Sequence, residues 1–299
     1  MSPRGRGERA MVPPAEFRSY YDRPVLKKPV WKHWVPAYFF AGGLAAGSSL
    51  LAEALAWSGD RRAARRARGT AFAAIGAGTA FLVADLGRQD RSHHMLRVFR
   101  PSSPMNMGTW LLTAYGPAAG AAALAEEVGL PAVARAGGVL AAALAPAVAT
   151  YTGVLVADTA VPVWHDAYRE LPFVFAAGAA ASAGAAAVLV APVHGVPAAA
   201  VRFALFGVGA EVAAVEAMRR RLGPLVAEVY HEGEAARLEQ SARAATVAGG
   251  AFLIPRATRR IGAALVFAGA ALQRFAITAA GTQSARDPKY VVVPQRERI

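Results

Sequence analysis

Runs of about 20 apolar residues, separated by short polar stretches, make up most of this 299-residue chain. A bilayer core of about 30 Å is crossed by roughly 20 apolar residues in helical form. The pattern therefore predicts an all-α integral membrane bundle of about eight transmembrane helices. Their approximate ranges are 34–57, 70–86, 106–125, 136–160, 171–190, 198–218, 244–254 and 261–280.

The predicted helices form one membrane domain, residues 34–280, between polar tails at 1–33 and 281–299. Residues 219–243 are rich in charge and are expected to connect two spans along the membrane surface. Aromatic and lysine residues before the first span predict an interfacial belt. Its members are Tyr20, Tyr21, Lys27, Lys28, Trp31, Lys32 and Trp34.

Composition favours a membrane protein over a soluble one. The chain is 55% hydrophobic with a mean hydropathy of +0.30, which is more apolar than a soluble domain of this length requires. Alanine and glycine dominate the apolar runs, and both close helix packing in lipid and a GC-rich genome explain that bias. The formal net charge is +13. Its arginines flank the apolar runs, so lipid headgroups explain them better than nucleic acid does.

An even number of spans places both termini, and the loops after the second, fourth and sixth spans, on one side of the membrane. The polar residues capable of chemistry gather on that side, in 87–105, 161–170 and 281–299. The loops on the other side are short and contain little beyond arginine. Arginine counts do not decide which side faces the cytoplasm. The 61–68 block favours a cytoplasmic location for its own side, whereas the basic tails favour the opposite orientation.

Four side chains near the polar side have the chemistry of a quinone site. Asp85 and Asp158 end the second and fourth spans, Tyr151 lies two helical turns before Asp158, and His165 follows a proline turn. A quinone needs donors at its carbonyl oxygens and groups that move two protons as two electrons are exchanged. A phenol, carboxylates and an imidazole meet those needs. The alternative is that both aspartates only cap helix ends and pair with nearby arginines.

The histidine and cysteine content argues against other redox centres in this chain. A bis-histidine haem needs two histidines facing each other within apolar spans. All six histidines lie at span ends or in loops: His33, His93, His94, His165, His194 and His231. No set of side chains has metal-ligand spacing, so no metal site is predicted. The chain has no cysteine, which excludes disulfides and thiolate-bound iron–sulfur clusters within it.

Four segments, taken together, closely resemble the NrfD family, which includes the membrane subunit of polysulfide reductase. The resemblance extends over nearly the whole chain. The segments are PVLKKPVWKHWVPAYFFAGGLAAGSSLLA (24–52), ADLGRQDRSHHMLRVFRPSSPMNMGTWLL (84–112), YTGVLVADTAVPVWHDAYRELPFVFA (151–176) and RFAITAAGTQSARDPKY (274–290).

This resemblance implies a multi-pass subunit of about eight helices in the bacterial cell membrane that exchanges electrons with menaquinone or another quinone. It implies two partners, a ferredoxin-like iron–sulfur subunit and a catalytic subunit that is often a molybdopterin enzyme. It implies no haem or other redox metal in the chain itself.

Individual residues follow from the same resemblance. Tyr151 matches a tyrosine placed at the quinone in polysulfide reductase, and Asp158 matches a polar position there. His165 matches a histidine near the quinone site of the related alternative complex III subunit. Pro36 and Phe39 replace an asparagine and a histidine that face the quinone in polysulfide reductase. That departure favours Asp85 and His165 as the proton-exchanging pair.

Two other functions remain open. One is a passive anchor or proton-translocating element with no quinone of its own. In that case Glu53, Glu211 and Glu216, with Arg202, are the residues that would line a proton path. Pairing of those glutamates with arginine explains them about as well. A transporter is less favoured, because no convincing internal repeat relates residues 34–125 to 171–280.

Overall fold

A computed structural model describes residues 25–297, which contain helices and no strand. Tyr20 and Tyr21 of the predicted belt lie outside this range. Eight helices have 20 residues or more: α1 (Trp34–Trp57), α2 (Arg61–Asp85), α3 (Pro104–Glu127), α4 (Pro131–Ala157), α6 (Leu171–Val190), α7 (Ala198–Ala227), α8 (Gly233–Leu253) and α9 (Arg259–Arg286). Shorter elements are η2 (Gln89–Arg97), α5 (Pro162–Asp166), η3 (Glu228–His231) and α10 (Lys289–Glu297).

Six of the described helices are long and apolar enough to cross a membrane: α1, α2, α4, α6, α7 with η3, and α9. The chain is therefore a multi-pass membrane protein, as predicted. The two remaining long helices, α3 and α8, are not among these candidate spans, and they pack as hairpin partners, α3 on α4 and α8 on α9. The all-helical class is confirmed, whereas the count of about eight spans stays a prediction.

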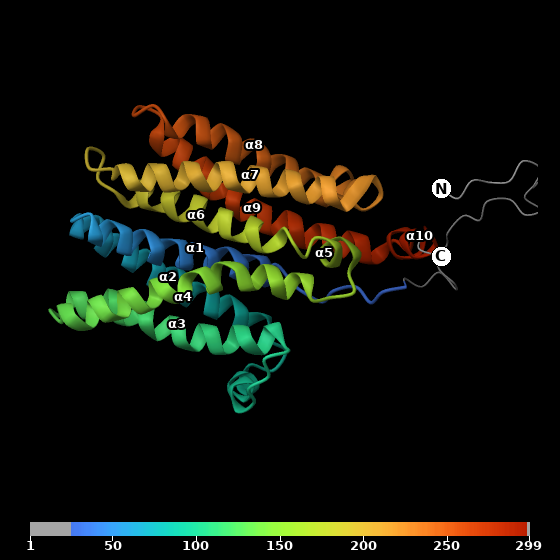
Figure 1. The fold of residues 1–299 in the computed structure, drawn as a ribbon, viewed down its shortest axis with the longest axis horizontal. Coiled ribbons are helices and arrows are strands. Elements are labelled where there is room, and N and C mark those ends of the chain that lie inside the picture. Colours follow the sequence, from blue (N-terminus) through green and yellow to red (C-terminus); the bar gives the residue numbers. More distant parts are fainter. Residues whose placement is uncertain (1–24, 298–299) are drawn as a thin grey trace, which may run out of the picture.

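The long helices form two units of four, α1 to α4 and α6 to α9, and corresponding helices pack against each other in both units (Figure 1). In the first unit α1 packs on α2, α3 packs on α4, and α1 packs on α4. In the second, α6 packs on α7, α8 on α9, and α6 on α9. The units meet where α1 contacts α6. The sequence showed no convincing repeat, so this correspondence is visible only in the tertiary contacts.

The two helices at that junction are the most buried. In α1 and α6, 78% of the apolar segment is buried, against 28% for α7. Small residues permit this close packing, because backbones approach where side chains are short. Gly184 of α6 lies against the backbone of Ala204, and Gly207 of α7 lies against the backbone of Ala181.

Three boundaries differ from the prediction. Helix α2 begins at Arg61 rather than near Thr70, because Asp60 accepts a hydrogen bond from the main-chain N–H of Ala63 and caps a helix that continues through the arginines. The 219–243 region, expected to be a polar connection that could be helical, is largely helical and forms the end of α7 and the first half of α8. Helix α9 continues past residue 280 to Arg286, and α10 follows within the predicted polar tail.

The two ends of the bundle differ in character (Figure 1). One end, here called the α5 end, has α5, η2 and α10. The other, here called the turn end, has the short connections at 58–60, 128–130, 191–197 and 254–258. This is the division expected from an even number of long helices.

Candidate functional site

The four predicted site residues all belong to elements that reach the α5 end. Asp85 is the last residue of α2, Asp158 directly follows α4, and His165 lies in α5. Tyr151 lies within α4, about two turns before its end. The topology therefore brings these residues to one end, although they come from three separate elements.

Tyr151 is the most deeply placed of the four. Its side chain is partly buried and packs against two apolar clusters, one containing Trp164 and the other Tyr115. Its ring lies directly on Gly108 of α3, where a Cβ atom would overlap it. The hydroxyl is buried and has no hydrogen-bond partner within the described residues. A buried hydroxyl without a partner is costly, so this atom is available to a ligand.

Asp85, Asp158 and His165 lie nearer the surface. Asp85 is half-buried and accepts a hydrogen bond of 3.4 Å from the main-chain N–H of Lys32. Asp158 and His165 are exposed. Neither aspartate forms an ion pair with the arginine side chains that the structure describes, which do not include that of Arg91. The four side chains are not joined by direct hydrogen bonds to one another.

Trp164 fixes the position of α5. It is 1% exposed, and its indole Nε1 donates a 2.7 Å hydrogen bond to the main-chain oxygen of Ile277 in α9. Trp31 stacks on it with ring centroids 5.0 Å apart. Sequence reasoning noted this residue only as the neighbour of His165. Its role required knowledge of the facing helix, which passes close enough because Gly281 has no side chain.

Charged groups hold α5 from its other side. Arg221 of α7 forms an ion pair of 2.6 Å with Glu170 and donates to the main-chain oxygen of Asp166. Tyr168 lies under the Arg221 guanidinium, 5.1 Å from ring centroid to Cζ. The histidine at position 165 is thus exposed on a short helix that is anchored to both α7 and α9.

A second polar cluster lies among α7, α8 and α9, and sequence reasoning found only part of it. Glu211, Glu239 and Arg274 are buried. Arg274 Nη1 lies 3.7 Å from Glu211 Oε1, and Arg219 Nη1 lies 3.8 Å from Glu239 Oε1. The carboxylate oxygens of both glutamates are buried and make no hydrogen bond to described protein atoms.

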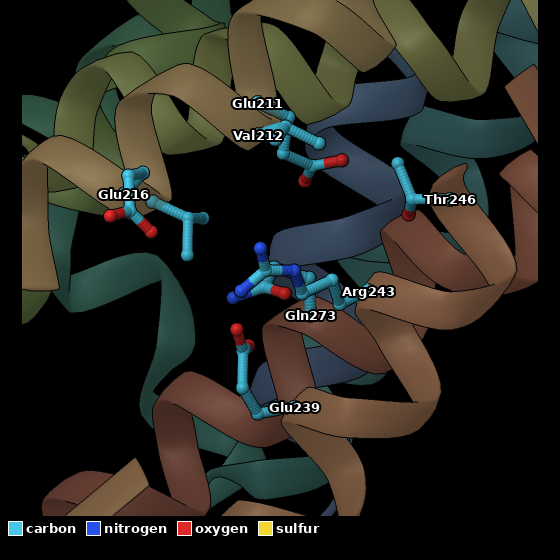
Figure 2. A pocket seen from close by; sticks show the side chains of 8 residues that line it. Glu211, Val212, Glu216, Glu239, Arg243, Thr246 and Gln273 are labelled. Carbon is cyan, nitrogen blue, oxygen red and sulfur yellow. The ribbon is translucent and has the colours of Figure 1, made fainter.

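Figure 2 shows the space between these helices. The side chains of Glu211, Glu239, Arg243 and Gln273 point into it. The cavity has a volume of about 20 Å³, enough for a water molecule. A water there would supply hydrogen bonds that the two carboxylates lack.

The other glutamates singled out from the sequence have arginine partners. Glu53 pairs with Arg68 at 2.6 Å, and Glu216 pairs with Arg220 at 3.0 Å. Arg202 is exposed and is not the partner of any of them. Each of the three glutamates therefore lies within ion-pair distance of an arginine, as the alternative given for these residues predicts.

Metal-ligating side chains do not converge within the described part of the chain, where no group of three or more histidine or carboxylate residues is close enough to hold an ion. His93 and His94 lie together in η2, with ring centroids 4.4 Å apart. The six histidines all lie in short elements, turns or at helix ends.

Comparison with known proteins gives one informative result. No functionally curated protein matches the chain. The sequence profile of the family described as polysulphide reductase, NrfD, matches residues 24–198. This match contains all four predicted residues at the α5 end, whereas the cluster of Glu211, Glu239 and Arg274 lies beyond it. Since more than half of the 299 residues match, the chain belongs to the NrfD family.

Proposed function

We propose that this chain is the quinone-reactive membrane subunit of a multi-subunit oxidoreductase in the bacterial cell membrane. It has eight transmembrane helices in this proposal, with α3 and α8 completing the six apolar ones. It exchanges electrons between menaquinol, or another quinol, and a ferredoxin-like iron–sulfur subunit. A further subunit, of the molybdopterin type, carries out the terminal reaction.

The observation that carries this proposal is the buried, unpartnered hydroxyl of Tyr151. It lies in apolar surroundings at the end of the bundle where the polar loops gather, and within the part of the chain that matches the family. A quinone head group fits such a place, because its carbonyl oxygen accepts a hydrogen bond and its ring is apolar. The residues present therefore fit the group that the family implies.

When bound, a quinol supplies two electrons and two protons. In the proposed site Tyr151 would hydrogen-bond to one of the two ring oxygens, a carbonyl in the quinone and a hydroxyl in the quinol, and would orient the ring. Asp85 and His165 exchange the protons, since both lie at the α5 end within reach of water. Asp158, exposed at the end of α4, supplies a further polar contact. The packing of Trp164 against α9 keeps His165 in place.

The electrons leave through the partner subunit, because this chain has no cysteine to hold a cluster. The α5 end offers the partner a broad polar surface. Arg88, Arg97 and Arg100 are exposed there, in or beside η2. These cations suit an acidic surface on the iron–sulfur subunit.

A mild-detergent purification of the tagged full-length chain tests this function. Mass spectrometry of the copurifying proteins and of the extracted lipids is expected to identify a cysteine-rich ferredoxin-like protein, a molybdopterin-type subunit and bound quinone. A chain that purifies alone and without quinone would contradict the proposal and would favour a passive anchor or a transporter.

The cluster among α7, α8 and α9 favours a second candidate function, proton transfer within the membrane. Glu211 and Glu239 are buried, lack hydrogen bonds to described protein atoms and border a cavity large enough for water. Ionisable residues inside a membrane often belong to proton relays. The test is proton pumping by the complex in vesicles, with Glu211→Gln and Glu239→Gln expected to abolish it if this function is correct.

A further inference from the structure

A cleft at the turn end, far along the bundle from Tyr151, has no role in the function proposed above. It opens between the ends of α1 and α3 and the beginnings of α2 and α4, and its volume is about 630 Å³. Its lining combines charged side chains with Trp57 and small apolar residues. The charged residues are Arg61, Arg68, Arg135, Glu53 and Glu126.

Only some of the charged side chains in this cleft have an ion-pair partner. Arg68 is buried and lies between Glu53, at 2.6 Å, and Glu126, at 3.0 Å. Arg61 and Arg135 are exposed, and their guanidinium groups have no hydrogen bond or ion pair within residues 25–297. Three arginines against two glutamates leave a net charge of +1. In the cleft, Arg68 is paired with both glutamates, whereas Arg61 and Arg135 are cations without a partner among the described residues.

Arg68 also has an unused donor. Its Nε atom is buried and has no hydrogen-bond partner among the described residues, although both terminal nitrogens are occupied by carboxylates. A buried N–H without an acceptor costs free energy unless a ligand or water supplies one.

The start of α4 borders the same cleft. Its N-cap residue, Leu130, has no side-chain oxygen to accept from the first turn, whereas Asp60 caps α2. The main-chain N–H groups of the first turn of a helix lack intrahelical partners and carry a partial positive charge. Of the residues that line the cleft from the start of α4, Pro131 has no N–H and the Ala134 N–H donates to the main-chain oxygen of Leu130, so this helix contributes its partial positive charge and no free donor.

The side chains around the cleft are those expected at the depth of lipid headgroups. Trp57, on its rim, is 77% exposed, and exposed tryptophans at helix ends mark the boundary between hydrocarbon and water. Arg61 and Arg68 lie two turns apart on α2, or about 10 Å along its axis. The helix is free of charged residues from Gly69 to Ala84. The arginines thus occupy the headgroup layer above an apolar segment.

We propose that this cleft binds the phosphate of an anionic phospholipid. Arg61 and Arg135 contact the phosphate, as guanidinium groups do with two parallel hydrogen bonds. Zwitterionic lipids carry a cation beside their phosphate, which the two free arginines repel. The cleft therefore selects anionic lipid. The inference is independent of the quinone assignment, since it concerns the opposite end of the bundle.

Native mass spectrometry of the full-length chain in detergent tests the proposal. The protein is mixed with equal amounts of phosphatidylglycerol and phosphatidylcholine, and the retained lipid is measured. We expect phosphatidylglycerol to be retained preferentially. The variant Arg61→Gln/Arg135→Gln is expected to lose most of this preference, by about fivefold for each arginine, which corresponds to about 1 kcal/mol per cation near anionic lipid.

Arg256→Gln is the matched control. Arg256 is also exposed at the turn end and does not line the cleft, so Arg256→Gln removes one positive charge, half the change of the double variant, and is expected to leave the preference unchanged. Equal retention of both lipids by the wild type, or an equal loss in the control and the double variant, would overturn the proposal. Displacement of phosphatidylglycerol by millimolar inorganic phosphate would also overturn it, because the site would then serve a free anion.

The comparison of lipid retention requires that the variants are folded. Arg61 and Arg135 are exposed and unpaired, so their replacement is expected to leave the thermal unfolding temperature unchanged. Arg61→Lys/Arg135→Lys keeps both charges and is expected to retain most of the preference. A lysine variant that binds as poorly as the glutamine variant, while folded, would contradict recognition based on charge.

Discussion

The indole nitrogen of Trp164 donates a 2.7 Å hydrogen bond to the main-chain oxygen of Ile277, across the junction between α5 and α9. Ile277 belongs to the helix that also carries Arg274, one turn earlier. The position of His165, next to Trp164 in the chain, therefore depends on the same helix that holds the buried ion pair with Glu211. The two polar regions of the protein share one structural element.

Replacing Gly281 by alanine is expected to lower the thermal unfolding temperature. A Cβ atom there would overlap the Trp164 ring, and overpacking a core typically costs about 1–3 kcal/mol. Gly209→Ala is the control, because no atom lies within 4 Å of its Cβ position and alanine favours the helix. Thermal unfolding in detergent measures both variants. Equal unfolding temperatures for the two variants would contradict the packing described for Trp164.

Tyr151→Phe and Tyr115→Phe are expected to have opposite effects. The Tyr151 hydroxyl is buried and has no protein partner within the described residues, so its removal is expected to cause no loss of stability and to reduce quinol turnover about fivefold, the effect of one hydrogen bond. The Tyr115 hydroxyl is hydrogen-bonded to Ser49 at 2.7 Å, so its removal is expected to lower stability without a specific loss of turnover. Quinol oxidation by the purified complex and thermal unfolding are measured on both. Unchanged turnover in Tyr151→Phe would remove this residue from the site.

His165→Ala is expected to slow quinol-linked turnover by about 100-fold while leaving the complex assembled, since proton-transfer groups contribute about that factor. The side chain is exposed, so folding does not depend on it. His194→Ala is the control, because His194 is exposed in the connection between α6 and α7 at the turn end. Steady-state turnover and size-exclusion chromatography are the measurements. Turnover equal to that of the control would show that His165 has no part in proton exchange.

Asp85→Asn is expected to reduce quinol turnover in the same assay, because the amide does not accept a proton as the carboxylate does. Its side-chain oxygen still accepts the hydrogen bond from the main-chain N–H of Lys32, so the unfolding temperature is expected to stay unchanged. Asp60→Asn is the control at the other end of the bundle, where the asparagine still caps α2. A loss of turnover in both variants would point to a general effect of reduced negative charge.

Removing one partner of the Glu211–Arg274 pair is expected to destabilise the protein by about 3–5 kcal/mol, because the other charge stays buried and uncompensated. Replacing both, as Glu211→Leu/Arg274→Met, is expected to recover much of this loss. Thermal unfolding of the single and double variants gives the coupling between the two residues. Additive losses would show that the pair does not interact.

The double variant also separates the two functions proposed for the complex. If it regains stability and quinol turnover but no longer pumps protons, Glu211 belongs to a proton path. If turnover and pumping both return with stability, the pair is structural.

The sequence by itself determined the class of the protein and the end of the bundle where its chemistry lies. Apolar runs of about 20 residues predict helices, because each helix must satisfy its backbone hydrogen bonds within itself in a membrane. Asp85, Asp158 and His165 lie at ends of such runs, so an even number of long helices was enough to bring them to one end. The family followed from motifs in the same segments.

Tertiary structure alone decided the partners of the buried side chains. A hydrophobic run fixes the length of a helix but neither its rotation nor its neighbours, because alanine-rich helices are apolar on nearly all sides. For that reason the sequence left Glu211 without a partner and placed Glu239 at the surface, whereas packing pairs the first with Arg274 and buries the second. The unpartnered Tyr151 hydroxyl and the contact of Trp164 with Ile277 likewise depend on which helix faces which.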